Sequence, residues 1–341
     1  MVGHRFPFPC LPTGWYAIAL SQELKPGQIL SRHYFERDLI AYRLESGEVR
    51  VADAFCPHMG ANLGRVGCVE GDRVRCRFHG FVYGQDGQCV ETPYGGPPPR
   101  GARLGHWPVE EKSGLVLVWF DAAGRPPFWD VPALELEGWT NLRFRRFTIP
   151  THPQETTENS VDFGHFTQIH GFTDGQITEA VKSEGELLTT SYRAMRGIPT
   201  PNLSWMQLPV DYDVIVRGLG YSQVNVRIDP LRIRFRTFVL PIPIDDENLD
   251  LTLAISSPFD LGPHARLISR IMVGIIGREI EQDLDVWTYK TYLHAPKLAK
   301  GDGPVGDYRR YVKQFYPLDA DGNEVSDPQS PRPIQKQASP A

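Results

Sequence analysis

The sequence predicts an α+β protein in which a small all-β domain precedes a second domain built from an antiparallel sheet and helices. Short strand-like segments separated by turn residues fill the first third of the chain. Alternating segments and two helical segments follow in the remainder. The length of 341 residues also exceeds what one compact core usually takes, which favours two domains.

The first domain is predicted from paired strands. Residues 40–44 and 49–51 flank a Glu-Ser-Gly-Glu turn, and a second turn separates residues 81–83 from 89–91. The apolar run 115–120 is typical of a buried strand. We therefore expect a small all-β domain that ends before a glycine- and proline-containing linker.

That linker is Gly124-Arg125-Pro126-Pro127, so the expected domains span residues 1–124 and 125–320. In the second domain, residues 231–236 alternate strictly between apolar residues and arginine, which predicts a strand with one arginine face. Further strands are expected beside it, at 214–216 and 249–255.

Two helices are expected in the second domain, one around residues 155–170 and a longer one over about 265–292. The polar, proline-rich segment 321–341 is expected to be a flexible tail. The second domain is thus an antiparallel sheet with helices packed on it.

Composition narrows the classes of partner and location. The formal net charge of −5 gives no reason to expect nucleic acid or an anionic membrane as a partner. No apolar run reaches the length of a membrane span, and the N-terminus lacks the pattern of a secretory signal, so a cytoplasmic location is expected. Five cysteines, an odd number, argue against a disulfide framework.

Two of these cysteines form a metal-binding pattern with two histidines: Cys56-x-His58 and, seventeen residues further on, Cys76-x-x-His79. Two Cys and two His can hold a [2Fe–2S] cluster, with the cysteines on one iron and the histidines on the other. Structural zinc is the alternative, but zinc loops normally pair like ligands at wider spacing. Each loop here supplies one ligand of each type, which favours the iron–sulfur cluster.

A second group of ligand-type residues lies in the predicted helix. Asp162 and His165 are three residues apart and share a helix face, whereas His170 lies five residues beyond His165. The helix must bend or end near Gln168 for both imidazoles to converge. Two histidines and a carboxylate are the ligands of non-haem Fe(II) sites, although such a segment can also be a polar surface or a capped turn.

The carboxylate ligand is expected from the long helix, which offers Glu279, Glu281, Asp283 and Asp285. Asp283 falls within the apolar stripe of that helix, three residues after Ile280 and four before Trp287. A carboxylate on a buried face needs a partner, and a metal ion is one. We therefore expect Asp283 to be the third ligand and Asp285 to be solvated.

Both groups of residues resemble the motifs of the Rieske non-haem iron oxygenases. The resemblance extends over about residues 14–317, and its most specific parts are Cys56-Pro-His-Met-Gly-Ala, Cys76-Arg-Phe-His-Gly and Glu158-Asn-Ser-Val-Asp-Phe-Gly-His-Phe-Thr-Gln-Ile-His170. It implies a Rieske [2Fe–2S] domain followed by a helix-grip catalytic domain that carries a mononuclear iron. It also supports Asp283 as the third iron ligand.

Within that family, the chain resembles the branch of 3-ketosteroid 9α-hydroxylase oxygenases and Neverland-type cholesterol 7-desaturases. The segments that carry this resemblance are His58-Met-Gly-Ala-Asn-Leu-Gly64, Gly114-Leu-Val-Leu-Val-Trp-Phe120, Gln282-Asp283 with Trp287, and Gly301-Asp-Gly-Pro304. The implied activity is hydroxylation of a hydrophobic, steroid-like substrate by O2. Sterol desaturation, and a Rieske electron-transfer protein without mononuclear iron, are the alternatives.

The resemblance also implies partners and one more functional residue. Family members form trimers, and electrons reach them from NAD(P)H through a separate reductase of the flavin or ferredoxin type. Asp162 matches the carboxylate that bridges the two metal centres, by contacting His165 and His79 of a neighbouring subunit. Two positions depart from the family pattern, because Arg77 replaces a proline and Phe81 replaces a tryptophan.

Overall fold

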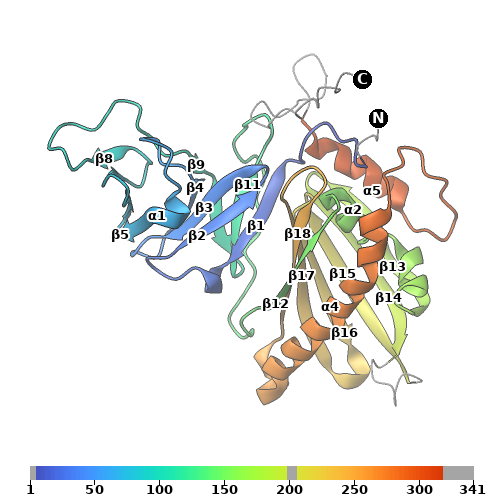
Figure 1. Cartoon of the computed structure of the whole chain (residues 1–341). Coiled ribbons are helices and arrows are strands. Elements are labelled where there is room, and N and C mark those ends of the chain that lie inside the picture. Colours follow the sequence, from blue (N-terminus) through green and yellow to red (C-terminus); the bar gives the residue numbers. More distant parts are fainter. Residues whose placement is uncertain (1–4, 198–205, 318–341) are drawn as a thin grey trace, which may run out of the picture.

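The computed structural model describes residues 5–197 and 206–317, which form two β-rich parts side by side (Figure 1). The α+β prediction is confirmed: sheets with little helix make up the first part, and a large sheet with helices makes up the second. The predicted tail, residues 321–341, lies outside the described residues. Within those residues, no helix is both long and apolar enough to cross a bilayer.

The first part contains three small sheets, with strand orders β1-β11-β10, β2-β3-β4-β9 and β5-β6-β7-β8. Its elements are β1 (Gly14–Leu20), η1 (Ser21–Glu23), β2 (Ile29–Tyr34), β3 (Arg37–Arg43), β4 (Val49–Asp53), α1 (Leu63–Val66), β5 (Gly67–Glu70), β6 (Arg73–Cys76), β7 (Val82–Tyr83), β8 (Cys89–Glu91), β9 (His106–Trp107), β10 (Val109–Lys112) and β11 (Leu115–Phe120). Both predicted hairpins are present, as β3–β4 and β7–β8. Every residue of β11 is buried, as its apolar sequence predicts.

The second part is built on one antiparallel sheet with the strand order β12-β18-β17-β16-β15-β14-β13. Its strands are β12 (Arg143–Ile149), β13 (Thr173–Glu184), β14 (Leu187–Gly197), β15 (Gln207–Arg217), β16 (Tyr221–Ile228), β17 (Ile233–Pro243) and β18 (Leu249–Ser256). Its helices are α2 (Pro153–Glu158), α3 (Phe163–Gln168), η2 (Asp229–Leu231), η3 (Phe259–His264), α4 (Ala265–Tyr289), α5 (Val305–Val312) and η4 (Lys313–Phe315). Helix α4 runs along one face of the sheet (Figure 1).

The structure departs from two of the strand predictions. The alternating strand begins at Ile233 rather than 231, because a 3-10 turn ends at Leu231 and Arg232 adopts a left-handed conformation with φ of 52°. The segment 249–255 lies in β18, directly beside that strand, but β16 separates 214–216 from it. Local alternation predicts a strand, whereas the order of strands depends on contacts that are distant in sequence.

The helix predicted around residues 155–170 is two short helices, and this prediction is wrong in that respect. α2 ends at Glu158, and α3 begins at Phe163. Asp162 lies between them with φ of −83° and ψ of 88°, and its carboxylate caps α3 by accepting a hydrogen bond from the backbone N–H of His165. The second helix ends at Gln168, as predicted, and the long helix α4 ends at Tyr289, three residues early.

The two parts share a buried apolar interface that fixes them against each other. Trp15 and Trp119 of the first part pack in one cluster with Tyr221 and Phe238 of the large sheet. Gly220 lies where the backbones meet, and a Cβ atom there would collide with the carbonyl oxygen of Trp15 and with the ring of Tyr16. The close approach of the two parts therefore requires glycine at position 220.

We predict that Gly220→Ala lowers the stability of the protein by about 1–3 kcal/mol, because the added methyl group has no space at this interface. Thermal unfolding followed by circular dichroism would measure the effect. Gly274→Ala is the matched control, since a Cβ atom at that position of α4 meets nothing within 4 Å. The control should unfold at the wild-type temperature or above, and an equally stable Gly220→Ala would contradict the close contact.

Candidate metal centres

Two loops of the first part have the same backbone geometry. In the loop 56–61, the N–H of Cys56 donates to the carbonyl of Ala61 at 2.8 Å, and the N–H of Gly60 donates to the carbonyl of Cys56 at 2.9 Å. The loop 76–81 repeats both hydrogen bonds, each at 2.8 Å. Gly60 and its counterpart Gly80 have φ of 74° and 73°, a conformation that favours glycine. The two Cys-and-His motifs therefore lie on a pair of matching loops.

These loops bring together the four residues expected to bind a cluster. Cys56 and Cys76 are buried free thiols, and the ring centroids of His58 and His79 lie 4.8 Å apart. The Nδ1 atom of His79 is buried and has no hydrogen-bond partner within the described residues. The Oη atom of Tyr83 lies 3.0 Å from the Sγ atom of Cys56, where it can donate to a thiolate. Two thiols and an unpartnered imidazole nitrogen fit the donor set of a Rieske cluster.

The two departures from the family pattern have different surroundings. Phe81 is buried, and its ring stacks on the ring of His58 with a centroid distance of 3.9 Å and an interplanar angle of 11°. It can therefore hold this imidazole in place, as a larger aromatic residue would. Arg77 is exposed, so its charge lies at the surface of this part of the chain.

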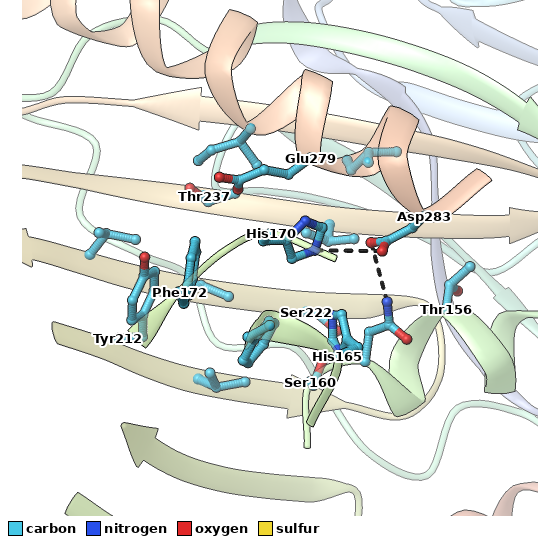
Figure 2. A pocket seen from close by; sticks show the side chains of 18 of the residues that line it. Thr156, Ser160, His165, His170, Phe172, Tyr212, Ser222, Thr237, Glu279 and Asp283 are labelled. Atoms are coloured by element: carbon cyan, nitrogen blue, oxygen red, sulfur yellow. Dashed lines mark hydrogen bonds and ion pairs between the residues drawn. The ribbon is translucent and has the colours of Figure 1, made fainter. Parts of the chain in front are cut away.

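A second group of ligand-type residues lies in the other part of the chain (Figure 2). One donor atom from each of His165, His170 and Asp283 lies within 4.8 Å of the other two. His165 comes from α3, His170 from the loop that follows it, and Asp283 from α4. The break after α3 allows the two imidazoles to converge, with ring centroids 5.3 Å apart.

Both histidines of this group have neighbours that orient their rings. The Nδ1 atom of His170 lies 3.0 Å from the Oε1 atom of Gln282, and its Nε2 atom lies 3.5 Å from the Oδ1 atom of Asp283. The Nδ1 atom of His165 lies 3.6 Å from the Oδ2 atom of Asp162. Gln282 therefore holds the ring of His170 by a hydrogen bond, whereas the buried Nδ1 atom of His165 is at ion-pair distance from Asp162 and makes no hydrogen bond within the described residues. Both Nε2 atoms remain available for a metal ion.

Electrostatics support this arrangement. Burial lowers the pKa of His170, but Asp283 and Gln282 outweigh that effect and raise it overall. Burial likewise raises the pKa of Asp162, but contact with His165 outweighs it and lowers the pKa overall. Asp162 therefore remains an anion that can accept a hydrogen bond from an imidazole N–H.

Among the four acidic candidates of α4, only Asp283 joins the histidines. It is buried, and the amide of Asn159 donates to its Oδ2 atom at 3.3 Å. Glu281 and Asp285 are exposed, and Glu279 forms an ion pair with Arg196. Two imidazoles and one buried carboxylate fit a divalent iron ion, and such a facial triad leaves positions open for other ligands.

His165, His170 and Asp283 open onto a cavity of about 950 Å³, counted to include its solvent-exposed mouth. Stacked aromatic rings form one wall, with Tyr192 and Tyr212 at 4.6 Å and Phe166 and Tyr192 at 5.1 Å between centroids. The apolar lining consists of Phe166, Phe172, Tyr192, Tyr212, Val214, Val224, Val226, Phe235, Val239, Ile276, Ile280 and Trp287. A largely apolar lining with a few polar groups is typical of a cavity that binds a hydrophobic small molecule.

Two family models cover most of the chain. The Rieske [2Fe–2S] domain matches residues 14–108, and the 3-ketosteroid 9α-hydroxylase C-terminal domain matches residues 118–316. The oxygenase component of a 3-ketosteroid-9-alpha-monooxygenase from Rhodococcus rhodochrous is 30% identical, over 91% of this chain and 84% of that protein. This chain belongs to the Rieske oxygenase family.

Other relatives of this Rieske oxygenase are desaturases. The cholesterol 7-desaturase of Bombyx mori is 29% identical over 92% of this chain and 71% of its own length. Among solved structures, apo dicamba monooxygenase has a TM-score of 0.69 at 17% identity, covering 90% of this chain and 97% of that one. Pseudomonas putida NdmA with caffeine has a TM-score of 0.70 at 18% identity, covering 88% and 89%. These structures share the fold.

Several residues around the oxygenase site were not predicted from the sequence. Arg196 and Tyr212 line the cavity from β14 and β15, and Asn159 orients the carboxylate of Asp283. Alternation along β14 and β15 could have indicated which side chains share the cavity face. The contacts of these residues with α4 join segments more than 60 residues apart in the sequence, so no local sequence pattern could predict them.

A further contact positions α3 itself. Gly303, with φ of 86°, packs on the start of this helix, where a Cβ atom would collide with the carbonyl oxygen of Val161 and lie 3.1 Å from the ring of Phe163. The Gly301-Asp-Gly-Pro304 segment therefore supports the residues on either side of Asp162. Asp162 lies between Val161 and Phe163, so we expect a shift of this contact to disturb the spacing between Asp162 and His165.

We predict that Gly303→Ala weakens binding of a divalent metal ion at His165, His170 and Asp283 by about 10–100-fold, the usual effect of disturbing the support of a metal site. Titration of iron-depleted protein with Co(II), followed by its visible absorption, would measure this. Gly301→Ala is the matched control, because a Cβ atom there meets nothing within 4 Å. Equal Co(II) affinities for the two variants would show that the Gly303 contact does not support the site.

Proposed function

We propose that this chain is the oxygenase component of a monooxygenase that hydroxylates a hydrophobic, steroid-like substrate with O2. The observation that carries the proposal is the group of His165, His170 and Asp283 at the edge of a largely apolar cavity. The Rhodococcus rhodochrous relative, a 3-ketosteroid-9-alpha-monooxygenase component, supports the steroid-like substrate. Membership of the Rieske oxygenase family supports the reaction type.

In this proposal, Cys56, His58, Cys76 and His79 hold the [2Fe–2S] cluster, and His165, His170 and Asp283 hold a mononuclear iron. When bound, the cluster supplies single electrons and the iron activates O2. Gln282 and Asp162 orient the two imidazoles through their Nδ1 atoms, and Asn159 orients Asp283. The apolar walls exclude water and place the substrate beside the ligand group.

The electrons come from NAD(P)H through a separate reductase in this proposal. Support comes from the Rhodococcus relative, which is the oxygenase component of a monooxygenase. The cluster loops flank the β5–β8 sheet, at the end of the first part that is remote from α4 (Figure 1). Met59 and Phe78 are exposed on the two cluster loops, which supports the proposal that a reductase and another copy of the chain meet this end.

We further propose a homotrimer in which the cluster of one copy faces the iron of the next. The remoteness of the β5–β8 sheet from α4 within one chain supports this arrangement (Figure 1). Asp162 would bridge His165 and His79 of the neighbouring copy, and its side chain is 35% exposed, which leaves one carboxylate edge accessible. We also propose that the two domains divide near residue 124, at the glycine- and proline-containing linker.

Desaturation is the second candidate reaction, because the relatives include cholesterol 7-desaturases as well as the hydroxylating monooxygenase. Both reactions begin with removal of a hydrogen atom from an unactivated carbon, so the same ligand group serves either one. Product analysis separates them, since hydroxylation adds one oxygen atom to the substrate and desaturation removes two hydrogen atoms.

The proposal predicts three iron atoms and two sulfides per chain, and Asp283→Asn should leave two irons and two sulfides. Electron paramagnetic resonance of reduced, nitric-oxide-treated protein should show a cluster signal and an iron–nitrosyl signal that a bound steroid reshapes. Asp285→Asn is the control, because Asp285 is exposed and should leave both signals intact. Wild-type protein that is replete in metal and lacks the nitrosyl signal would support an electron carrier instead.

We also predict that Asp162→Asn keeps all three irons yet lowers turnover about 100-fold, in line with the larger effects of changing a residue that orients a metal ligand. Asparagine retains the size and the cap of α3 but removes the negative charge between the two centres. Turnover with reductase and the rate of iron oxidation in a single turnover would be measured together. Wild-type turnover in this variant would refute the bridging role of Asp162.

A further inference from the structure

The cavity contains one charged pair that the proposed chemistry does not use. Arg196 of β14 and Glu279 of α4 form an ion pair within it, and their side chains are 17% and 19% exposed. Glu279 precedes Asp283 by four residues, so it lies on the same face of α4 about 6 Å along the helix axis. Figure 2 shows both carboxylates projecting from α4 toward the sheet.

Two hydroxyl groups near this pair lack hydrogen-bond partners. The Oη atom of Tyr212 and the Oγ1 atom of Thr237 are buried, line the cavity and have no partner within the described residues. Burial raises the pKa of Tyr212 despite the charge of Arg196 and its close contact with the hydroxyl, so the Oη atom lies beside the guanidinium and its own hydrogen remains available to donate. Buried polar groups are nearly always paired, so two unpaired hydroxyls on one cavity indicate that a ligand or water completes them.

The ion pair itself retains hydrogen-bonding capacity. A guanidinium carries five N–H groups, more than the one carboxylate of Glu279 can accept. Arg196 also lies over the ring of Phe172, 5.3 Å from its centroid, which fixes the guanidinium plane against the cavity wall. Arg196 and Tyr212 are thus two donors at one polar site in an otherwise largely apolar cavity.

We propose that Arg196, Glu279 and Tyr212 form a polar subsite that binds a neutral oxygen function of the substrate, a carbonyl or a hydroxyl group. This inference rests on the proposed function and adds how the substrate is oriented. The subsite is about one helical turn from Asp283, so it fixes the distance between the recognised oxygen and the oxidised carbon. In an apolar cavity, a few placed polar groups determine which way a ligand lies.

The charge balance of the subsite favours a neutral oxygen over a carboxylate. Arg196 and Glu279 cancel each other, and an anionic ligand would meet the negative charge of Glu279 at short range in a poorly solvated cavity. A carbonyl oxygen accepts from both Tyr212 and Arg196 and leaves the ion pair intact. A hydroxyl group can in addition donate to Glu279.

The test compares two steroids that differ only in their oxygens: androst-4-ene-3,17-dione and androst-4-ene. Their affinities for the reduced, nitric-oxide-treated protein are measured from the change in the iron–nitrosyl signal. The wild-type protein should bind the dione at least 10-fold more tightly. Tyr212→Phe and Arg196→Gln should each reduce this preference by about 10-fold, the value of one hydrogen bond, with little change for androst-4-ene.

Tyr221→Phe is the matched control, because it removes a buried tyrosine hydroxyl in the cluster between the two parts, outside the cavity. It should keep the wild-type preference. Iron and sulfide content shows whether each variant is folded and loaded. Products formed from the dione give a second readout, since loss of the subsite should spread oxidation over more than one carbon.

The outcomes separate this inference from the proposed function. If both steroids reshape the nitrosyl signal and the variants keep the wild-type preference, the subsite is refuted and the oxygenase proposal stands. If neither steroid changes the signal of the wild-type protein, the steroid-like substrate is refuted and the subsite falls with it. Lost preference in both cavity variants, with the control unchanged, supports the subsite.

Discussion

Two buried carboxylates of α2 determine how the catalytic part is assembled. Glu155 is fully buried and lies 2.7 Å from the Nζ atom of Lys290, immediately after α4, while Glu158 pairs with Arg309 of α5 at the same distance. Leaving such a charge without its partner costs about 3–5 kcal/mol, so α2 and the end of α4 cannot shift independently. Asn159 directly follows Glu158 and donates to Asp283. The ion pair of Glu158 with Arg309 therefore also helps to position Asp283.

The histidines depend on a different constraint, the short length of α3, which ends at Gln168 between them. An unbroken helix would place residues 165 and 170 about 140° apart around its axis, on different faces. The structure instead starts a new helix at Phe163, capped by Asp162, and ends it at Gln168, so His170 turns back beside His165. Asp162 therefore has a structural role as the cap of α3 and an electrostatic role toward His165.

Features that depend on residues close together in the sequence could be predicted, whereas features that depend on residues far apart in the sequence could not. The Cys56–His58 and Cys76–His79 loops are local, and their ligand spacing together with their glycines was readable. The burial of Asp283 could be predicted because it depends only on the apolar stripe of one helix. The break before Phe163 was missed because it involves Gly303, some 140 residues away, and the Arg196–Glu279 pair was missed because it joins a strand to a helix.

One face of α4 supplies both the proposed metal ligand Asp283 and part of the wall of the proposed substrate cavity. Ile276, Glu279, Ile280, Asp283 and Trp287 follow one another at helical spacing and all line the cavity. Because α4 is a rigid helix, it fixes the distance between Asp283 and each of the other α4 residues that line the cavity. Substitutions at positions such as Ile276 and Ile280 reshape the cavity without touching a ligand. The same ligand group can thus serve different substrates in one family, and substrate choice is determined by the residues between the ligands.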